Sequence, residues 1–273
     1  MKTRIIVALS LLPLLLIIVL ACPVWAAALL VGAMSVVAVY EFLYTTGLVR
    51  HTRIIAYSMV MALLVTAGSY FGCNKTIAMA AGFVYFMLLF LELLVSHAKL
   101  SFASVGLAAF SAVVVPYALS ALVRILAMEQ GRFLIIVSFI LAFTSDSGAY
   151  FAGRFFGKHK LAPVISPKKT IEGLIGGVVS CVIFMIGYGL VLHFCFDFTV
   201  NYLNAAVYGV VGSLASVVGD LVFSVAKRQT GIKDYGKLMP GHGGVLDRFD
   251  STVVVAPLTE LLCLLLPLLE AVV

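Results

Sequence analysis

The sequence predicts an all-helical bundle of about nine membrane-spanning segments, and three observations support this fold class. Hydrophobic residues make up 63% of the 273 residues and charged residues only 11%, against roughly 45–50% and about 25% in soluble domains. Apolar runs of about 20 residues, the length that a helix needs to cross a bilayer core about 30 Å thick, recur along the chain. The runs are continuous rather than alternating, which favours helices over a barrel, the only other structure that satisfies its backbone hydrogen bonds in lipid.

The expected spans follow from hydropathy and from the polar breaks between apolar runs. Their bounds, to within a few residues, are 5–21, 24–45, 53–72, 76–95, 103–123, 132–152, 171–195, 202–226 and 252–272. The first span begins like a signal peptide, but its apolar run is long and further spans follow, so we expect it to be retained. The five cysteines form no CxxC pair, which predicts packing residues rather than a disulfide framework or a zinc site.

Lys and Arg are distributed unevenly between the two sides of this nine-span arrangement. Of the 18, 15 fall on the side that holds the N-terminus and the long loops, and only Lys75, Arg124 and Arg132 fall on the other. Basic loops of membrane proteins face the cytoplasm. We therefore expect a multi-pass protein of the cell inner (plasma) membrane, with its N-terminus and its long loops in the cytoplasm.

Polar chemistry is concentrated in the second half of the chain. We expect residues 1–130 to form about five N-terminal transmembrane helices, and residues 131–273 to form the functional transmembrane helices with two cytoplasmic loops. No internal repeat, low-complexity tract or soluble domain is visible. In the first half, Glu41 and Glu92 lie within expected spans, and we interpret each as a buried hydrogen-bonding residue.

Two carboxylates lie inside apolar spans of the second half. Asp146 is in FTSDSGAYFAGRFFGKH and Asp220 is in SLASVVGDLVFSVAKR, each six residues from the expected cytoplasmic end of its span. At about 1.5 Å per helical residue, both would lie roughly 9 Å deep. A charge at the bilayer centre costs about 2.5–3.5 kcal/mol, so each needs a partner, a metal ion or a water-filled cavity. The alternatives are a structural salt bridge and an ion site, and the loop described below favours the ion site.

The segment LAPVISPKKTIEG, residues 161–173, adds two lysines. Ser166 and Pro167 have the form of an N-cap and a first helical residue, so we expect the seventh span to begin there. Lys168 and Lys169 would then lie in the first turn, where the helix dipole disfavours cations. Free amide groups and two lysines fit a phosphate cradle. Contacts with lipid headgroups, or a role in fixing topology, explain the lysines equally well.

The loop from residue 227 to residue 250 holds eight of the 30 charged residues and five glycines. Glycines let the backbone approach a ligand closely. Cationic donors suited to phosphates are Lys227, Arg228 and Lys233. Asp247 and Asp250 are three apart, so a helix starting there would bring both to one face, where carboxylates and phosphate oxygens suit Mg²⁺. His242, between glycines, could be a base, a phosphate donor or a turn residue.

The stretch SVAKRQTGIKDYGKLMPGHGGVLDRFDS, residues 224–251, closely resembles the signature of the phosphatidate cytidylyltransferases, also called CDP-diacylglycerol synthases. The matching positions are Ser224, Lys227, Arg228, Lys233, Asp234, Pro240, His242, Gly243, Gly244, Asp247, Arg248 and Asp250. Ala226 stands where the family usually has a larger apolar residue. Two further stretches agree, DSGAYFAGRFFGKHKLAPVISPKKTIEG and SLASVVGDLVFSVAKR. The resemblance covers about residues 140–260, and the first half is compatible with it without being diagnostic.

The resemblance implies a helical fold of about nine spans, often dimeric, with a cytoplasm-facing site that is open to lipid. It implies transfer of the cytidylyl group of CTP to phosphatidate, giving CDP-diacylglycerol and pyrophosphate for phospholipid synthesis. It also implies Mg²⁺ as cofactor, with K⁺ as a second ion. The expected partners are CTP, phosphatidate and membrane lipids; a homodimer fits the resemblance, and no nucleic acid is expected.

The resemblance and the chemistry of the residues together give each candidate residue an expected role. Metal binding is expected of Asp220 and Asp247. The expected catalytic residues are Asp220, Lys227, Arg228, His242, Asp247, Arg248 and Asp250. The expected substrate-binding residues are Asp146, Lys168, Lys169, Ser224, Lys233, Asp234, Gly243 and Gly244. The attacking lipid phosphate has a second pKa of about 6 and is largely ionised at neutral pH, so positioning and charge neutralisation matter more than a general base.

Two other functions compete with this one. A transporter or channel would bind a coupling ion at Asp146 and Asp220, but it predicts related halves and polar residues near mid-membrane, whereas the polar residues here crowd one side and no repeat is visible. A closer rival is a related lipid-activating enzyme, such as a CTP-dependent polyprenol kinase or a synthase that uses another lipid phosphate. The long signature favours phosphatidate.

Overall fold

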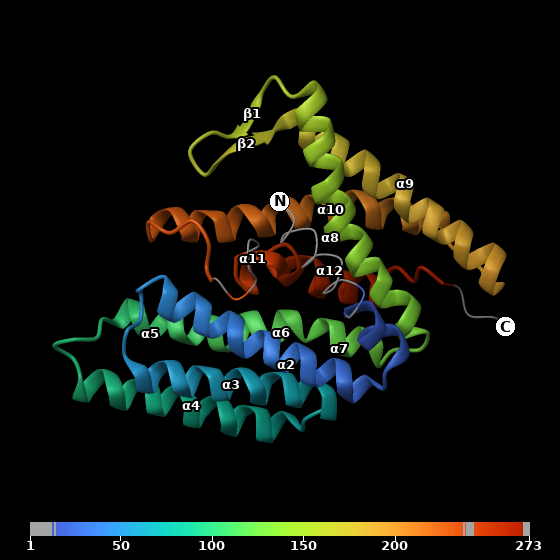
Figure 1. Ribbon diagram of the computed structural model, residues 1–273. Coiled ribbons are helices and arrows are strands. Elements are labelled where there is room, and N and C mark those ends of the chain that lie inside the picture. The colour runs from blue at the N-terminus through green and yellow to red at the C-terminus, as the bar shows by residue number, and fades with distance from the viewer. Residues whose placement is uncertain (1–12, 14, 237, 239–242, 270–273) are drawn as a thin grey trace. The chain divides into compact units, whose positions relative to one another are not determined.

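The computed structural model of the protein describes residues 13, 15–236, 238 and 243–269, and nearly all regular structure in this part of the chain is helical (Figure 1). The all-α class predicted from composition is therefore confirmed. The chain divides into two compact units: the first comprises Met1–Arg132 with Lys227–Phe249, and the second comprises Phe133–Ala226 with Asp250–Val273. The polar loop that follows residue 227 thus belongs to the same unit as the N-terminal helices.

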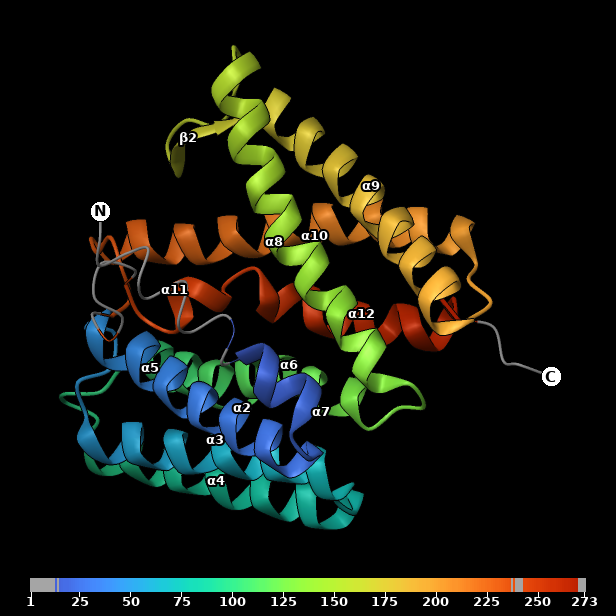
Figure 2. The ribbon, with the colours of Figure 1, turned by 45° about the vertical axis from the view of Figure 1, so that its right-hand side comes forward.

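The first unit is built from helices of unequal length. They are α2 (Val24–Tyr40), the π-helical turn η1 (Glu41–Thr45), α3 (Thr52–Phe71), α4 (Lys75–Val95), α5 (Phe102–Ala109), the π-helical turn η2 (Phe110–Val114), α6 (Val115–Leu119), α7 (Ala121–Leu126) and, in the polar loop, α11 (Leu246–Phe249). Helix α3 packs against both α2 and α4 (Figures 1 and 2). In the most apolar window of α4 only 17% of residues are buried, against 61% for α2 with η1. Exposed aromatic and aliphatic side chains on α4, such as Phe83 and Leu94, are therefore those of a lipid-facing helix.

Local sequence explains where several of these helices begin, end or widen. The N-cap of α4 is Asn74, whose side-chain oxygen accepts a hydrogen bond from the Thr76 N–H at 2.9 Å. Helix α3 ends at Gly72, whose φ of 63° lies in the left-handed region that glycine adopts without penalty. The π-helical turn η2 comes directly before the helix that contains Pro116, a residue that lacks a backbone donor and disturbs the regular ladder.

The second unit consists of long helices and one hairpin. Its elements are α8 (Gly131–Phe156), β1 (Lys160–Ala162), β2 (Ser166–Thr170), α9 (Ile171–Phe196), α10 (Tyr202–Gln229) and α12 (Thr252–Leu265), with the last residues of α10 counted in the first unit. The strands β1 and β2 are antiparallel, with Lys160 opposite Thr170. The hairpin connects α8 to α9, and in both ribbon views the two helices converge on it (Figures 1 and 2).

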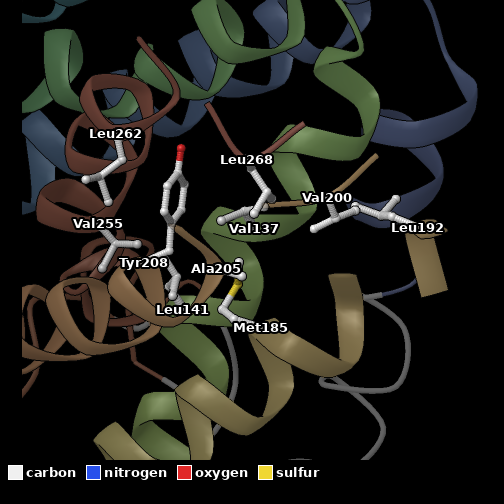
Figure 3. Packing of buried hydrophobic residues seen from close by; sticks show 10 residues of the cluster. All are labelled: Val137, Leu141, Met185, Leu192, Val200, Ala205, Tyr208, Val255, Leu262 and Leu268. Carbon is white, nitrogen blue, oxygen red and sulfur yellow. The ribbon is translucent and has the colours of Figure 1, made fainter. Parts of the chain in front are cut away.

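Buried apolar side chains hold the second unit together at the end away from the hairpin. The cluster in Figure 3 is formed by Val137, Leu141, Met185, Leu192, Val200, Ala205, Tyr208, Val255, Leu262 and Leu268. Tyr208 is fully buried, and its hydroxyl donates to the Leu266 carbonyl at 3.1 Å, so the one polar atom that it brings into the core is satisfied. The cluster therefore fixes α12 and the segment after it against α8, α9 and α10.

Seven helical segments of the described chain are long and apolar enough to cross a membrane, and each matches an expected span. They are Val24–Thr45, Thr52–Phe71, Lys75–Val95, Phe102–Leu126, Gly131–Phe156, Ile171–Phe196 and Tyr202–Gln229. The protein is thus a polytopic membrane protein by length and composition of its helices. The expected first span, 5–21, lies mostly outside the described residues. Helix α12 has 14 residues and reaches about 21 Å, short of a bilayer core of about 30 Å, so the count of nine stays a prediction.

Candidate functional site

A cavity of about 330 Å³ lies in the second unit, between the hairpin and the helices α8, α9 and α10. Its charged lining residues are Asp146, Arg154, Lys168, Lys169 and Asp220. Helix α8 contributes the first two, β2 the lysines and α10 the last. The structure thus brings together both carboxylates that the sequence places inside apolar spans and both lysines of the segment between them.

Asp220 forms an ion pair through one of its carboxylate oxygens and accepts a hydrogen bond at the other. Its Oδ2 lies 2.5 Å from the Nζ of Lys169, and Ser224, one turn further along α10, donates its hydroxyl to Oδ1 at 3.2 Å. The side chains of Asp220 and Lys169 are 27% and 22% exposed. The pair is therefore shielded enough to be oriented and open enough to exchange partners with a ligand in the cavity.

Lys168 and Lys169 do not lie in a helical turn, and the expected helix start at residue 166 is wrong. Both belong to β2, and α9 begins only at Ile171. Its N-cap is Thr170, whose hydroxyl oxygen accepts the Gly173 N–H at 3.1 Å. The lysines therefore line the cavity from an extended strand.

The physical reason for this difference is that Ser166–Pro167 is compatible with two structures. A residue before proline is pushed out of the α region toward extended backbone, so the same pair that can begin a helix can also begin a strand. Placing the helix start at residue 171 keeps two cations out of the first turn and puts Glu172 there instead. The helix dipole favours an acidic residue at that position.

Small residues bring α8 and α9 close together beside this cavity. A Cβ added at Gly176 would overlap the side chain of Ala152, and one added at Gly148 would overlap that of Ser180. Small residues allow such close backbone approach between helices in membranes. The crossing holds the turn of α8 that carries Asp146 beside α9.

A second polar cluster lies in the first unit around Asp247, whose side chain is 2% exposed. Its Oδ1 accepts from the Lys227 ammonium group at 2.9 Å, and its Oδ2 accepts from the backbone N–H groups of Tyr235 at 2.7 Å and Gly244 at 3.0 Å. Gly243 has a φ of +89°, and a Cβ there would press against the carboxylate of Asp247. Both oxygens of this buried carboxylate are therefore occupied by donors of the chain itself.

The helix expected to bring Asp247 and Asp250 to one face stops too early. Helix α11 begins at Leu246 and ends at Phe249, so Asp250 lies outside it. The side chain of Asp250 accepts the N–H of Ser251 at 2.8 Å, which satisfies a donor at the start of the next helix. The expectation of a shared helical face is wrong because the chain turns between two short helical segments.

The remaining candidate residues are mostly at the surface of their units. Exposed side chains are those of Asp146, Lys168, Arg228, Lys233, Asp234 and Arg248. His242 lies outside the described residues. Among the residues that the structure describes, no group of three or more His, Cys, Asp or Glu side chains is arranged to hold a metal ion.

Glu41 and Glu92 are both buried and hydrogen-bonded, as expected, being 3% and 7% exposed. What the sequence did not indicate is the partner of Glu41. Its carboxylate accepts from the backbone N–H groups of Val245 at 3.1 Å and Leu246 at 2.9 Å, next to Asp247 in the chain. No local pattern links two segments 204 residues apart, so sequence reasoning had no signal for this contact.

Comparison with known proteins identifies related sequences. The model of the cytidylyltransferase family matches residues 2–266. Curated phosphatidate cytidylyltransferases of Staphylococcus haemolyticus, Staphylococcus saprophyticus and Staphylococcus aureus (strain COL) are 46%, 42% and 44% identical to this chain over 134 residues. Each match covers 49% of this chain and 50% of the relative. The chain therefore spans about half the length of the curated relatives that it matches.

Proposed function

The chain belongs to the cytidylyltransferase family, and on this premise we propose that it transfers the cytidylyl group of CTP to phosphatidate. The products are CDP-diacylglycerol, for phospholipid synthesis, and pyrophosphate. The observation that carries the proposal is the cavity of the second unit, in which Asp146 and Asp220 line the same space as Lys168 and Lys169. Paired carboxylates beside paired cations suit a ligand that combines a metal ion with phosphates.

The reaction is a displacement at phosphorus. An oxygen of the lipid phosphate forms a bond to the α-phosphorus of CTP, and the bond from that phosphorus to the oxygen shared with the β-phosphate breaks. The electron pair leaves with pyrophosphate. Both reactants are polyanions that repel each other, so the protein contributes chiefly by positioning them and by stabilising the charge on the leaving group.

Lys169 and Asp220 are proposed to act as exchangeable partners. In the absence of substrate each neutralises the other across 2.5 Å. A phosphate that binds Lys169 releases Asp220, and a cation that binds Asp220 releases Lys169, so the two ligands favour each other's binding. Ser224 keeps one oxygen of Asp220 oriented, and Lys168 adds positive charge from the same strand.

Cytidylyltransferases generally use a divalent metal ion, and we propose Mg²⁺, with K⁺ as a second ion. The proposed ligands are Asp220 and Asp247, with Asp146 either holding the second ion or orienting a lysine. Asp220 fits this role as it stands, because its carboxylate is partly exposed on the cavity. Asp247 fits only by exchanging Lys227 for the ion, since its oxygens already have three donors. Bound Mg²⁺ would offset the negative charge of the phosphates.

The polar loop is proposed to complete the site through its charged and glycine residues. The loop residues proposed to take part in catalysis are Lys227, Arg228, His242, Arg248 and Asp250. Those proposed to bind substrate are Lys233, Asp234, Gly243 and Gly244. We further propose that the site faces the cytoplasm at the bacterial plasma membrane and that the protein forms a homodimer. The orientation is supported by the distribution of Lys and Arg, of which 15 of 18 lie on one side of the nine-span arrangement.

The test follows two labels of CTP in parallel, with purified full-length protein in phosphatidate–detergent micelles. Label from the α-phosphate in a lipid product reports cytidylyl transfer, whereas label from the γ-phosphate reports a kinase. We expect Mg²⁺-dependent, EDTA-sensitive α-label in lipid from the wild type and none from Asp220→Asn or Asp247→Asn. γ-Label in lipid when a polyprenol replaces phosphatidate, or no labelled lipid from folded wild type, would refute the proposal.

A further inference from the structure

We propose that Glu41 is a positioning residue for the loop that carries Asp247, holding the backbone of that loop in the form in which Asp247 and its partners meet. The effect on catalysis rests on the function proposed above, whereas the effect on the loop can be measured without it. Every contact that supports the proposal lies within the first unit.

The carboxylate of Glu41 is buried, and both of its oxygens accept hydrogen bonds from the loop backbone. Glu41 opens the π-helical turn η1 at the end of α2, and π-helical turns inside helices frequently mark functional positions. Its Oε1 accepts the Val245 N–H and its Oε2 accepts the Leu246 N–H. These amides stand at the start of α11, where backbone donors have no partner within the helix. A buried carboxylate is costly unless donors surround it, so the carboxylate and the two amides stabilise each other.

The loop is shaped to admit this carboxylate. A Cβ added at Gly244 or at Gly236 would overlap the carboxylate of Glu41 as its nearest neighbour. Only glycine leaves room for the carboxylate at both positions, which gives a steric reason for two of the glycines in the loop. The loop backbone therefore packs around Glu41 instead of merely touching it.

The turn η1 also contacts Tyr235, whose backbone N–H is one of the donors to Asp247. Thr45, the last residue of η1, donates its hydroxyl to the carbonyl oxygen of Tyr235, and Tyr235 donates its N–H to Asp247. The turn η1 thus binds the backbone of the loop at two places, at Tyr235 and at Val245–Leu246. Asp247 is positioned through both contacts and does not touch Glu41 by any hydrogen bond in the described residues.

The test compares Glu41→Gln with Glu92→Gln in full-length protein in detergent. Glutamine keeps the size of Glu41 but offers one acceptor oxygen where the two amides need two. Glu92 is a matched control, because it is a buried carboxylate of the same unit that contacts His51, Arg53 and Tyr57. Hydrogen exchange of peptides covering residues 235–247 and of α3 and α4 reports each region separately. Cytidylyl transfer is measured on the same samples.

We expect Glu41→Gln to speed exchange in peptides 235–247 by about 10- to 100-fold, since a hydrogen bond to a charged group is lost, with α3 and α4 unchanged. Glu92→Gln should speed exchange in α3 and α4 and leave exchange in peptides 235–247 unchanged. The kcat/KM of Glu41→Gln should also fall, in proportion to the fraction of molecules that keep the loop in its wild-type form. A Glu41→Gln loop that exchanges as slowly as the wild type overturns the inference, and so does a fall in kcat/KM with no loosening of the loop.

Two further outcomes remain informative. If Glu41→Gln fails to fold, Gly236→Ala displaces the carboxylate while keeping its charge, and the same local loosening is expected; exchange at the wild-type rate in that variant overturns the inference. If the wild type makes no CDP-lipid while Glu41→Gln still loosens the loop alone, the proposed function fails and the structural role of Glu41 stands.

Discussion

Replacing Asp247 by asparagine removes one charge from a buried ion pair while changing the shape of the side chain very little. The side chains of Lys227 and Asp247 are only 10% and 2% exposed, and their charged atoms are 2.9 Å apart. The carboxylate also accepts two backbone N–H groups. Asparagine retains one oxygen for these amides and turns its NH₂ group toward the ammonium of Lys227.

The expected loss of stability follows from the charge that is left behind. Removing one partner of a buried ion pair typically costs about 3–5 kcal/mol, because the other charge stays in a poorly hydrated place. Since asparagine still serves the backbone donors, the expected loss is at the lower end, about 3 kcal/mol. Lys227→Met should cost a similar amount, because it leaves the carboxylate with the two amides alone.

The double variant Lys227→Met/Asp247→Asn measures how much of each loss comes from the interaction between the two charges. With neither charge present, its loss should be about 2 kcal/mol smaller than the sum of the two single losses, the scale of coupling between contacting residues. The measurement is the free energy of unfolding by SDS in mixed micelles for all four proteins. Additive losses, or a loss below about 0.5 kcal/mol for Asp247→Asn, would refute the argument that this pair is a buried, mutually stabilising one.

Three further changes test other parts of the structure. Thr170→Ala should destabilise the protein by about 1 kcal/mol through loss of the α9 N-cap, measured by SDS unfolding, and Thr170→Ser should not. Gly176→Leu should cost about 1–3 kcal/mol by overpacking the α8–α9 crossing, whereas Gly187→Leu on the same helix, where an added Cβ meets nothing within 4 Å, should be tolerated; equal losses would contradict this assignment. Lys169→Met should raise the KM for CTP about tenfold and weaken its dependence on salt, and an unchanged KM would exclude Lys169 from phosphate binding.

Composition and hydropathy were enough to predict the helical class and the approximate place of the seven long apolar segments, because burial in lipid imposes strong constraints on both. The boundary at the hairpin could not be predicted in the same way. Ser166–Pro167 and Thr170 compete to define the start of α9, and local preferences differ by only about 1 kcal/mol. In the structure residues 166–170 pair with β1 across the hairpin, with Lys160 opposite Thr170, a pairing that neither helix-start signal includes.

The candidate site shows the same division between local and non-local information. Residue types identified the charged loop and the two intramembrane aspartates, since such groups are costly in an apolar chain. Which donors satisfy them was not predictable: Asp220 meets Lys169 from a strand, and Glu41 meets amides 204 residues later in the chain. Contacts of this kind follow from tertiary packing, which a single sequence does not encode locally.

The contact between Glu41 and the loop also sets an order of events during biosynthesis. Residues 245 and 246 are made 204 and 205 positions after Glu41, which at about 5–20 residues per second means a delay of roughly 10–40 s. During that time the N-terminal helices are already synthesised, but the carboxylate at the end of α2 has none of the donors that it finds in the finished protein. The first unit can therefore reach its final form only after residues 245 and 246 are made, so its folding is completed by a segment synthesised long after its first helices.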